Sequence, residues 1–337
     1  MSDGKKVVES NKIWTCLITS VSYLPGLLTL HYSLIHKHQS KYPLVALYTP
    51  AFPGTGLAAL KARGIPCQLI EPLHPSTLNH YPNDPRFRDC WTKLVPFGLT
   101  QYARIVLLDA DMLVVRNMDE LMDVPLDDAT ALFAAAPACT CNPLRRAHYP
   151  RSWTPSACAY TAACPAPGMA ATGQCGELNG GLVVLRPSEA VFGQIRDYLG
   201  QPERTRALPF PDQSLLADLF RGRWLALPYV YNALKTMRWP GVHDALWRDD
   251  EVRCVHYILT PKPWEEIEKE EEGEGNGEVK VDEGVAGLGK DKDCNGAGKE
   301  RKVGRKRTGE VTHQWWVDVD LERRNWEREN RLRGDQW

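Results

Sequence analysis

Apolar positions in the first two thirds of the chain follow two different periods in turn. Short continuous apolar runs bounded by turn residues predict buried strands, and apolar residues recurring every three or four positions predict helices. The expected strands here are residues 13–19, 44–49, 67–70 and 104–108, and the expected helices lie at 27–35, 57–63 and 91–98. Because strands that alternate with helices indicate βαβ units, we expect an α/β fold with a Rossmann-like, mostly parallel sheet flanked by helices.

The second half of the chain is less regular. Residues 137–177 are rich in Pro, Ala and Cys and have no visible period, which indicates an ordered but irregular insertion. After it, strands are expected at 182–185, 224–227 and 252–256, and helices at 188–199 and 212–220. We interpret residues 12–264 as a single domain with insertions.

Three segments lie outside this domain. Residues 265–312 are rich in Glu, Gly and Lys and contain no aromatic side chain. They cannot bury enough apolar surface to offset their ordering entropy, so we expect a disordered charged insertion. Trp315, Trp316 and Trp326 predict that the tail, 313–337, is helical and packs on the domain. Residues 1–11 are polar and are expected to be flexible.

Composition excludes some classes of function. The 337 residues are 43% apolar and 25% charged, which is ordinary for a globular protein, and 41 basic residues balance 42 acidic ones. A net charge of −1 offers no electrostatic reason to expect a nucleic acid as partner. No apolar stretch is long enough to span a bilayer, so we expect a cytoplasmic protein without a membrane partner. Ten cysteines in that compartment should be thiols or metal ligands. The composition leaves open whether the protein forms a homodimer.

The clearest candidate for chemistry is a pair of aspartates at the end of a strand. Asp109 and Asp111 directly follow the apolar run 104–108. In open α/β sheets ligands bind just beyond the carboxyl ends of the strands. Two carboxylates there can hold a divalent cation, which stabilises the charge that develops on a departing diphosphate. The alternative is a pair of solvated aspartates at a loop edge.

Further polar residues follow other predicted strands. His256 comes after the last short strand, and an imidazole nitrogen can complete a metal site with mixed oxygen and nitrogen ligands, such as one for Mn²⁺. Lys262 follows closely and can reach a phosphate as a point charge. A histidine of this kind can also be merely packed or exposed.

Two more motifs have a structural and a functional interpretation. The run Asn179, Gly180, Gly181 opens a strand, where glycines permit close approach of a ligand to the backbone, or simply form a tight turn. Asp212 precedes Gln213 at a helix start, where Asp212 is expected to be the N-cap residue.

Taken together in this order, the motifs resemble those of glycosyltransferase family 8, which includes glycogenin and galactinol synthase. The resemblance covers most of residues 12–264. It rests on Trp91 to Leu94, Leu108 to Asp111, Asn179 to Gly181, Asp212 with Gln213, and His256 with Lys262, Pro263 and Trp264. It implies a GT-A fold, a UDP-sugar donor, Mn²⁺ and retention of the anomeric configuration.

The resemblance also assigns roles to residues of this chain. Asp109, Asp111 and His256 correspond to the family's metal ligands, and Lys262 to its phosphate-binding lysine. Thr19 and Tyr23 resemble residues that line the uridine pocket. The residues that resemble those around the donor sugar are Lys93, Asn179, Asp212 and Gln213, with Gly180 and Gly181 beside them. One departure stands out: the loop between His256 and Lys262 has no glycine, although the family usually has one there.

Details lean toward the galactinol synthase branch. They include the segments 41–45, 70–72 and 231–239, and a Cys-rich insertion that holds Cys139, Cys141, Cys158, Cys164 and Cys175. The spacing of these cysteines is not a standard zinc pattern, which favours free thiols or a structural role over a metal site.

The acceptor and the rival functions stay open. The acceptor is expected to be a hydroxyl compound, either a glycan or a small polyol such as inositol. A self-glycosylating primer like glycogenin is disfavoured because no tyrosine lies between Asn232 and Tyr257. A phosphatase of the haloacid dehalogenase class also places two aspartates after a strand, but Leu113 departs from that class's pattern.

Overall fold

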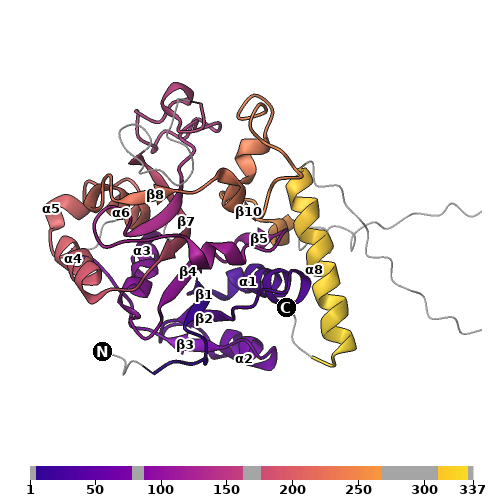
Figure 1. Ribbon diagram of the computed structural model, residues 1–337. Helices are drawn as coiled ribbons and strands as arrows, with labels where there is room; N and C mark the ends of the chain where they lie inside the picture. Colours follow the sequence, from indigo (N-terminus) through magenta and orange to yellow (C-terminus); the bar gives the residue numbers. More distant parts are fainter. Residues whose placement is uncertain (1–4, 78–86, 162–175, 267–309, 333–336) are drawn as a thin grey trace, which may run out of the picture.

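The structure is a computed structural model that describes residues 5–77, 87–161, 176–266, 310–332 and 337. In these residues the main sheet has seven strands, in the order β3-β2-β1-β4-β7-β6-β8 (Figure 1). The strands are β1 (Lys12–Ile18), β2 (Leu44–Tyr48), β3 (Cys67–Leu69), β4 (Arg104–Leu108), β6 (Phe133–Pro137), β7 (Leu178–Leu185) and β8 (Trp224–Ala226).

Strand direction confirms the expected mostly parallel sheet. Only the pairs that β7 makes with β4 and β6 are antiparallel, while the other neighbouring pairs in this sheet are parallel. Strand order reverses at β1, which has β2 on one side and β4 on the other. Such a reversal opens a crevice at the carboxyl ends of the two strands, where ligands of α/β proteins bind.

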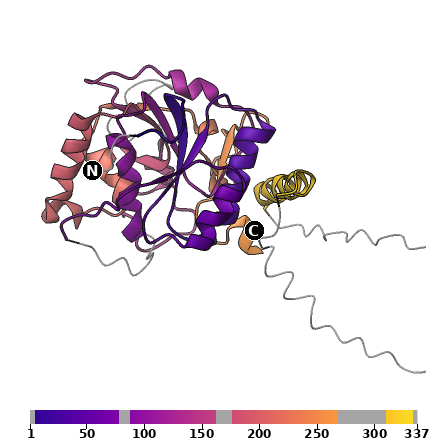
Figure 2. The same cartoon turned by 90° about the horizontal axis from the view of Figure 1, so that it is seen from below.

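Helices cover both faces of the sheet (Figure 2). One layer contains α1 (Leu24–His31), a π-helical continuation at Tyr32–Lys37, and α2 (Gly54–Ala62). The other contains α3 (Phe87–Cys90), the 3₁₀ helix η3 (Trp91–Gly98), α4 (Glu189–Leu199), α5 (Pro202–Thr205) and α6 (Pro211–Leu219). Short 3₁₀ turns lie at Val21–Tyr23, Asp119–Asp123, Pro155–Ala157, Tyr229–Tyr231 and Lys235–Arg238.

The two helical layers create two cores, one on each face of the sheet. Successive side chains of a strand point to opposite faces, so Ile13 packs in the core under η3, α4 and α6. Its neighbour Trp14 packs in the core under α1 and α2. This is why the central strands are continuous apolar runs rather than alternating ones.

A small second sheet and the last helix close one end of the molecule. The described residues place β5 (Met112–Val114), β10 (Cys254–His256) and β9 (Ala233–Leu234) side by side in that order. Helix α8 (Val311–Glu329) packs against α1 (Figure 1). No helix in the described part of the chain combines the length and hydropathy that a membrane span requires.

Buried ion pairs hold α8 in place. Asp320 accepts a hydrogen bond from Thr29 at 2.8 Å and pairs with Arg323 at 2.7 Å. Arg63 makes two hydrogen bonds to Glu327, at 2.8 and 3.0 Å. These contacts attach the last helix to both helices of one layer.

Some sequence expectations differ from the structure or fall outside it. The element at 91–98 is a 3₁₀ helix with Pro96 inside it, and β5 and β6 were not anticipated. Most of the segment expected to be disordered, 267–309, lies outside the described residues, as do 1–4 and 162–175.

Candidate active site

A cavity of about 360 Å³ lies at the carboxyl ends of β1 and β4, where the strand order reverses. Every candidate site residue lines it. These residues are Thr19, Tyr23, Lys93, Asp109, Asp111, Asn179, Gly180, Gly181, Asp212, Gln213, His256 and Lys262. They come from six segments of the chain, so the fold, and not one local motif, assembles the site.

The two aspartates and the histidine form one compact cluster. The ligand atoms of Asp109, Asp111 and His256 all lie within 4.8 Å of one another. His256 Nε2 is 3.3 Å from Asp111 Oδ1 and 3.7 Å from Asp109 Oδ2. Backbone bonds fix the loop, because Asp109 N–H donates to the Gly181 carbonyl and Tyr257 N–H to the Asp111 carbonyl. The cluster is therefore held by β4, β7 and β10 together.

A chain of amides orients the His256 ring. His256 Nδ1 lies 2.9 Å from Asn232 Oδ1, and Asn232 donates through Nδ2 to Asn179 Oδ1 at 2.9 Å. Because an amide oxygen only accepts, Nδ1 carries the proton and Nε2 presents its lone pair to the aspartates. Gly181 is required beside the ring, since a Cβ there would lie 2.3 Å from His256 Cε1.

Two lysines balance the acidic cluster. Lys262 is buried and donates to Asp111 Oδ2 at 2.5 Å and to the Tyr257 carbonyl at 2.6 Å. Burial raises the pKa of Asp111, but the buried ammonium of Lys262 outweighs it, and the pKa of this carboxyl lies well below its usual range. Asp111 is thus ionised at neutral pH.

Lys93 is the second of these lysines, and it pairs with Asp109 at 2.7 Å. Burial lowers the pKa of Lys93, but the carboxylates of Asp109 and Asp212 raise it more, so the net pKa lies well above the ordinary value. Lys93 is therefore a cation at neutral pH, paired with Asp109 and stabilised by the charge of Asp212 from a second segment.

Asp212 and Gln213 lie in the first turn of α6. The N-cap of this helix is Phe210 and Pro211 is its first residue, so the expectation that Asp212 is the N-cap residue is wrong. Asp212 instead lies beside Gly180, where a Cβ would come within 2.6 Å of Asp212 Oδ2. Gln213 Oε1 accepts from the Gly180 N–H at 3.3 Å. Burial raises the pKa of Asp212, against the opposing effect of Lys93.

The loop between His256 and Lys262, in which the family usually has a glycine, contains one constrained residue. Leu259 has φ of +66°, in the left-handed region that favours glycine. Both Ile258 and Leu259 line the cavity. The backbone at Leu259 therefore has a conformation typical of glycine, while its bulky side chain occupies space beside the cavity.

The irregular insertion forms another wall of the same cavity. Asn142, Arg146, Tyr149 and Trp153 line it. Tyr149 and Trp153 also stack around Phe210, immediately before α6. Three of the cysteines expected here, Cys139, Cys141 and Cys158, are free and lie together, while Cys164 and Cys175 are outside the described residues.

Comparison with known proteins shows which glycosyltransferases the chain is similar to. Residues 183–268 match the family described as Glycosyl transferase family 8. Galactinol synthase 1 of Ajuga reptans is 27% identical over 263 residues, which cover 74% of this chain and 72% of that protein. Galactinol synthase 1 of Solanum lycopersicum is 28% identical over 265 residues, covering 76% and 74%. The matched segment and these relatives together support a glycosyltransferase similar to those of family 8. The chain is a glycosyltransferase enzyme, and the phosphatase alternative is dropped.

Solved structures share the fold at low sequence identity. The WbbM bifunctional glycosyltransferase superposes with a TM-score of 0.54 at 17% identity, over 77% of this chain and 48% of that one. GlyE of Streptococcus pneumoniae TIGR4 gives 0.53 at 14% identity, over 95% and 64%. The chain thus spans about half of the first and under two thirds of the second. The expected GT-A fold is confirmed.

Sequence reasoning missed one residue that matters for the cluster. Asn232 had been noted only as part of a family-like segment, yet it bridges Asn179 and His256. The signal lay in the pattern, because a buried histidine that offers one nitrogen to a metal needs a partner on the other. The amino-acid sequence of the chain does not show which side chain supplies that partner.

Proposed function

We propose that this glycosyltransferase moves a hexose from a UDP-sugar to a hydroxyl acceptor and depends on a divalent cation, Mn²⁺. The observation that carries the proposal is the cluster of Asp109, Asp111 and His256 beside Lys262, at the point where the strand order reverses. It unites a candidate cation site and a buried positive charge in one cavity. A nucleoside diphosphate is the ligand class that such a site fits.

The donor set suits Mn²⁺. Two carboxylate oxygens and one imidazole nitrogen are ligands that this ion accepts. Adjacent ligand atoms of a six-coordinate divalent ion are about 3 Å apart, close to the 3.3 Å between His256 Nε2 and Asp111 Oδ1. Nε2 presents a lone pair because Asn232 holds the Nδ1 proton. A bound cation would act as a Lewis acid on the diphosphate and stabilise the negative charge of departing UDP.

The chain's own residues supply binding and orientation. Lys262 provides a second positive charge for the diphosphate from a position within the cavity wall. The Tyr23 ring lies 5.8 Å from the Lys262 ammonium, where it can cover a flat base next to the phosphates. Thr19, at the end of β1, faces the same part of the cavity.

A second group of residues is placed to hold the sugar. Lys93 and Asp212 offer a cation and a carboxylate for hydroxyl groups, and Asn179 offers an amide. Gln213 is oriented by its bond to Gly180. We propose that these residues orient the anomeric carbon, and that transfer retains its configuration.

The acceptor is proposed from the relatives. Galactinol synthases of two plants match three quarters of this chain, and a small polyol such as inositol is the acceptor class that we test first. The wall made by Asn142, Arg146 and Trp153 carries polar and aromatic groups of the kind that bind a polyhydroxy compound.

A transferase screen tests this function. Purified protein is incubated with UDP-galactose, UDP-glucose or GDP-mannose, with and without inositol, in Mn²⁺ or in EDTA. We expect UDP release and a hexosyl-inositol product with a UDP-sugar and Mn²⁺ only, and NMR of the product should show a retained α-anomer. Turnover that is equal in EDTA would overturn the metal requirement, and turnover of GDP-mannose alone would overturn the UDP-sugar assignment.

Intact-mass measurement separates the primer alternative. The protein alone, with a UDP-hexose and Mn²⁺, should keep its mass, because Tyr257 is fully buried and Tyr231 is bonded to Glu120. A ladder of added hexoses would instead establish self-glycosylation.

A further inference from the structure

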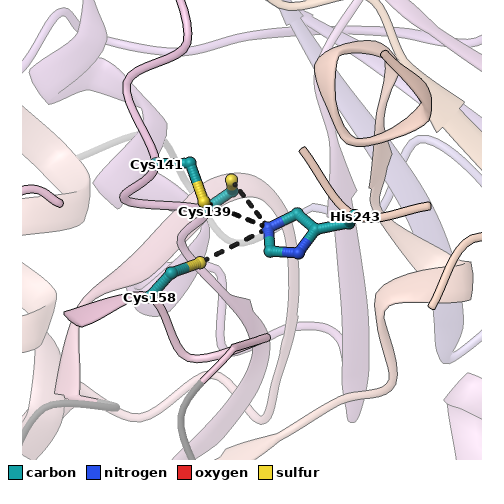
Figure 3. A group of neighbouring side chains, drawn as sticks. All are labelled: Cys139, Cys141, Cys158 and His243. Carbon is teal, nitrogen blue, oxygen red and sulfur yellow. Dashed lines mark hydrogen bonds between the residues drawn. The ribbon is translucent and has the colours of Figure 1, made fainter. Parts of the chain in front are cut away.

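Three cysteines of the insertion converge on one histidine from a distant segment. Cys139 and Cys141 follow β6, and Cys158 follows the 3₁₀ turn at Pro155–Ala157. All three sulfur atoms approach His243 Nε2, at 3.3, 3.4 and 3.5 Å respectively (Figure 3). His243 is 85 residues beyond Cys158. The convergence is therefore a product of the fold and not of a local motif.

Hydrogen bonding does not account for this arrangement. A single ring nitrogen either donates one proton or accepts at one lone pair. Three thiols around Nε2 therefore cannot all be bonded to it in the ordinary sense. The three cysteines are also free, so no disulfide explains their grouping. Atoms that surround a common point in this way are typical of the ligands of one metal ion.

The distances fit a tetrahedral zinc ion. Zn–S bonds of about 2.3 Å and Zn–N bonds of about 2.05 Å place sulfur and nitrogen ligands about 3.6 Å apart in a tetrahedron. The three sulfur-to-nitrogen distances here are 3.3 to 3.5 Å. All four ligand atoms lie within 4.8 Å of one another. Only a small adjustment separates the side chains from coordination geometry.

The chemistry of the donors selects the metal. Three thiolates and one imidazole form a Cys₃His set, which is a closed set typical of structural Zn²⁺. Soft sulfur ligands distinguish this site from the oxygen-rich cluster of the active site, which suits harder cations. We propose that Cys139, Cys141, Cys158 and His243 bind one structural Zn²⁺ ion, with release of the three thiol protons. This reverses the interpretation that their spacing favours.

The ion would fix a part of the molecule with little regular structure. Between β6 and β7, the described residues hold only one short 3₁₀ turn. Cys158, Cys141 and His243 are nevertheless buried, at 0%, 9% and 6% exposure. A zinc ion can hold together long loops that contain little helix or strand, and its binding contributes directly to their folding.

The same ion links this loop to the active-site cavity. Cys139 itself lines the cavity, and so do Asn142 and Arg146 from the loop that the ligands enclose. His243 lies on the segment between the turn at Lys235–Arg238 and β10, the strand that carries His256. Zinc therefore holds the insertion wall against the part of the chain that delivers His256.

Metal analysis of the purified full chain tests the proposal. Protein expressed in zinc-supplemented medium and dialysed without strong chelator is measured by plasma mass spectrometry. We expect one zinc per chain in the wild type and near zero in Cys158→Ser. Cys67→Ser is the matched control, because this free cysteine on β3 lies outside the cluster, and it should keep its zinc. Asp111→Asn should keep zinc as well, which separates this ion from the active-site cation.

A second measurement covers the case in which Cys158→Ser does not fold. Wild-type protein loaded with Co²⁺ in place of Zn²⁺ should show the sulfur-to-cobalt charge-transfer absorption and the intense visible bands of a tetrahedral thiolate site. Cys139→Ser should weaken the charge-transfer band. Wild type with no zinc above trace, equal zinc in Cys158→Ser, or a cobalt spectrum without thiolate bands would each overturn the proposal.

Discussion

Gly181→Ala is the substitution that probes the proposed metal site without replacing any of its proposed ligands. The new methyl carbon would lie 2.3 Å from His256 Cε1 and 2.5 Å from Nδ1. Carbon atoms in contact are normally at least about 3.5 Å apart, so the ring has to move by about 1 Å. His256 is 3% exposed and bonded through Nδ1 to Asn232 at 2.9 Å. The movement therefore disturbs both its packing and its orientation.

The size of the effect follows from these contacts. Overpacking of a buried site costs about 1–3 kcal/mol of stability. Loss of the hydrogen bond that orients a metal-binding histidine, here the bond from His256 to Asn232, typically lowers metal affinity about 10- to 100-fold. This is equivalent to about 1.4–2.7 kcal/mol. Activity should fall accordingly and recover in part at high Mn²⁺, because the ligands themselves remain.

Calorimetric titration with Mn²⁺ and kinetics over a range of Mn²⁺ concentrations measure this effect. Gly54→Ala and Gly193→Ala are matched controls, since a Cβ at either position meets no atom within 4 Å. Both should bind Mn²⁺ like the wild type. If Gly181→Ala keeps wild-type affinity and activity, the assignment of His256 as an ion ligand is refuted.

Three further predictions concern stability. Leu259→Gly should raise the free energy of unfolding by up to about 1 kcal/mol in a urea titration, because it relieves the φ of +66°; a decrease would show that the leucine side chain packs productively. Asp320→Ala should cost about 1–3 kcal/mol in the same titration, because it removes one of the two carboxylates that pair with the buried Arg323 and leaves Glu327 as the other, and a loss below 1 kcal/mol would contradict this. Burial and His36 lower the pKa of His31 to about 3. The unfolded chain, in which this histidine keeps its ordinary pKa of about 6.5, therefore binds the proton at higher pH than the folded protein does. The free energy of unfolding should fall by about 1.4 kcal/mol per pH unit as the pH drops from about 6.5 toward 3. His31→Gln should remove that part of the slope, and an unchanged slope would argue against a neutral imidazole at this position.

Much of the fold could be predicted because its strands carry a strong local signal. After Arg104, the run from Ile105 to Leu108 is apolar throughout because both faces of β4 are covered by helices. Strand β6 escaped notice because its core, Ala134 to Ala136, is rich in a residue with weak strand preference. The reversed direction of β7 has no local signature either, since it depends on how the chain returns to the sheet.

In the site, too, only the residues that belong to a local sequence pattern could be predicted. Asp109 and Asp111 could be found because their spacing and preceding strand are local features. The N-cap of α6 was misplaced because Pro211 occupies the first helical position, which moves the cap to Phe210. Asn232 and His243 meet their partners only through long-range packing, and no spacing in the sequence anticipates such contacts.

Titration of UDP into the protein by calorimetry tests whether the nucleotide binds through a cation at Asp109, Asp111 and His256. It is carried out in Mn²⁺ and in EDTA, with wild type and Asp111→Asn, a variant that keeps the shape of the side chain and a hydrogen-bond acceptor for Lys262. Wild type should bind UDP in Mn²⁺, EDTA should remove most of this binding, and Asp111→Asn should bind UDP weakly under both conditions. Equal UDP affinity with and without the ion, or in the variant and the wild type, would contradict this prediction.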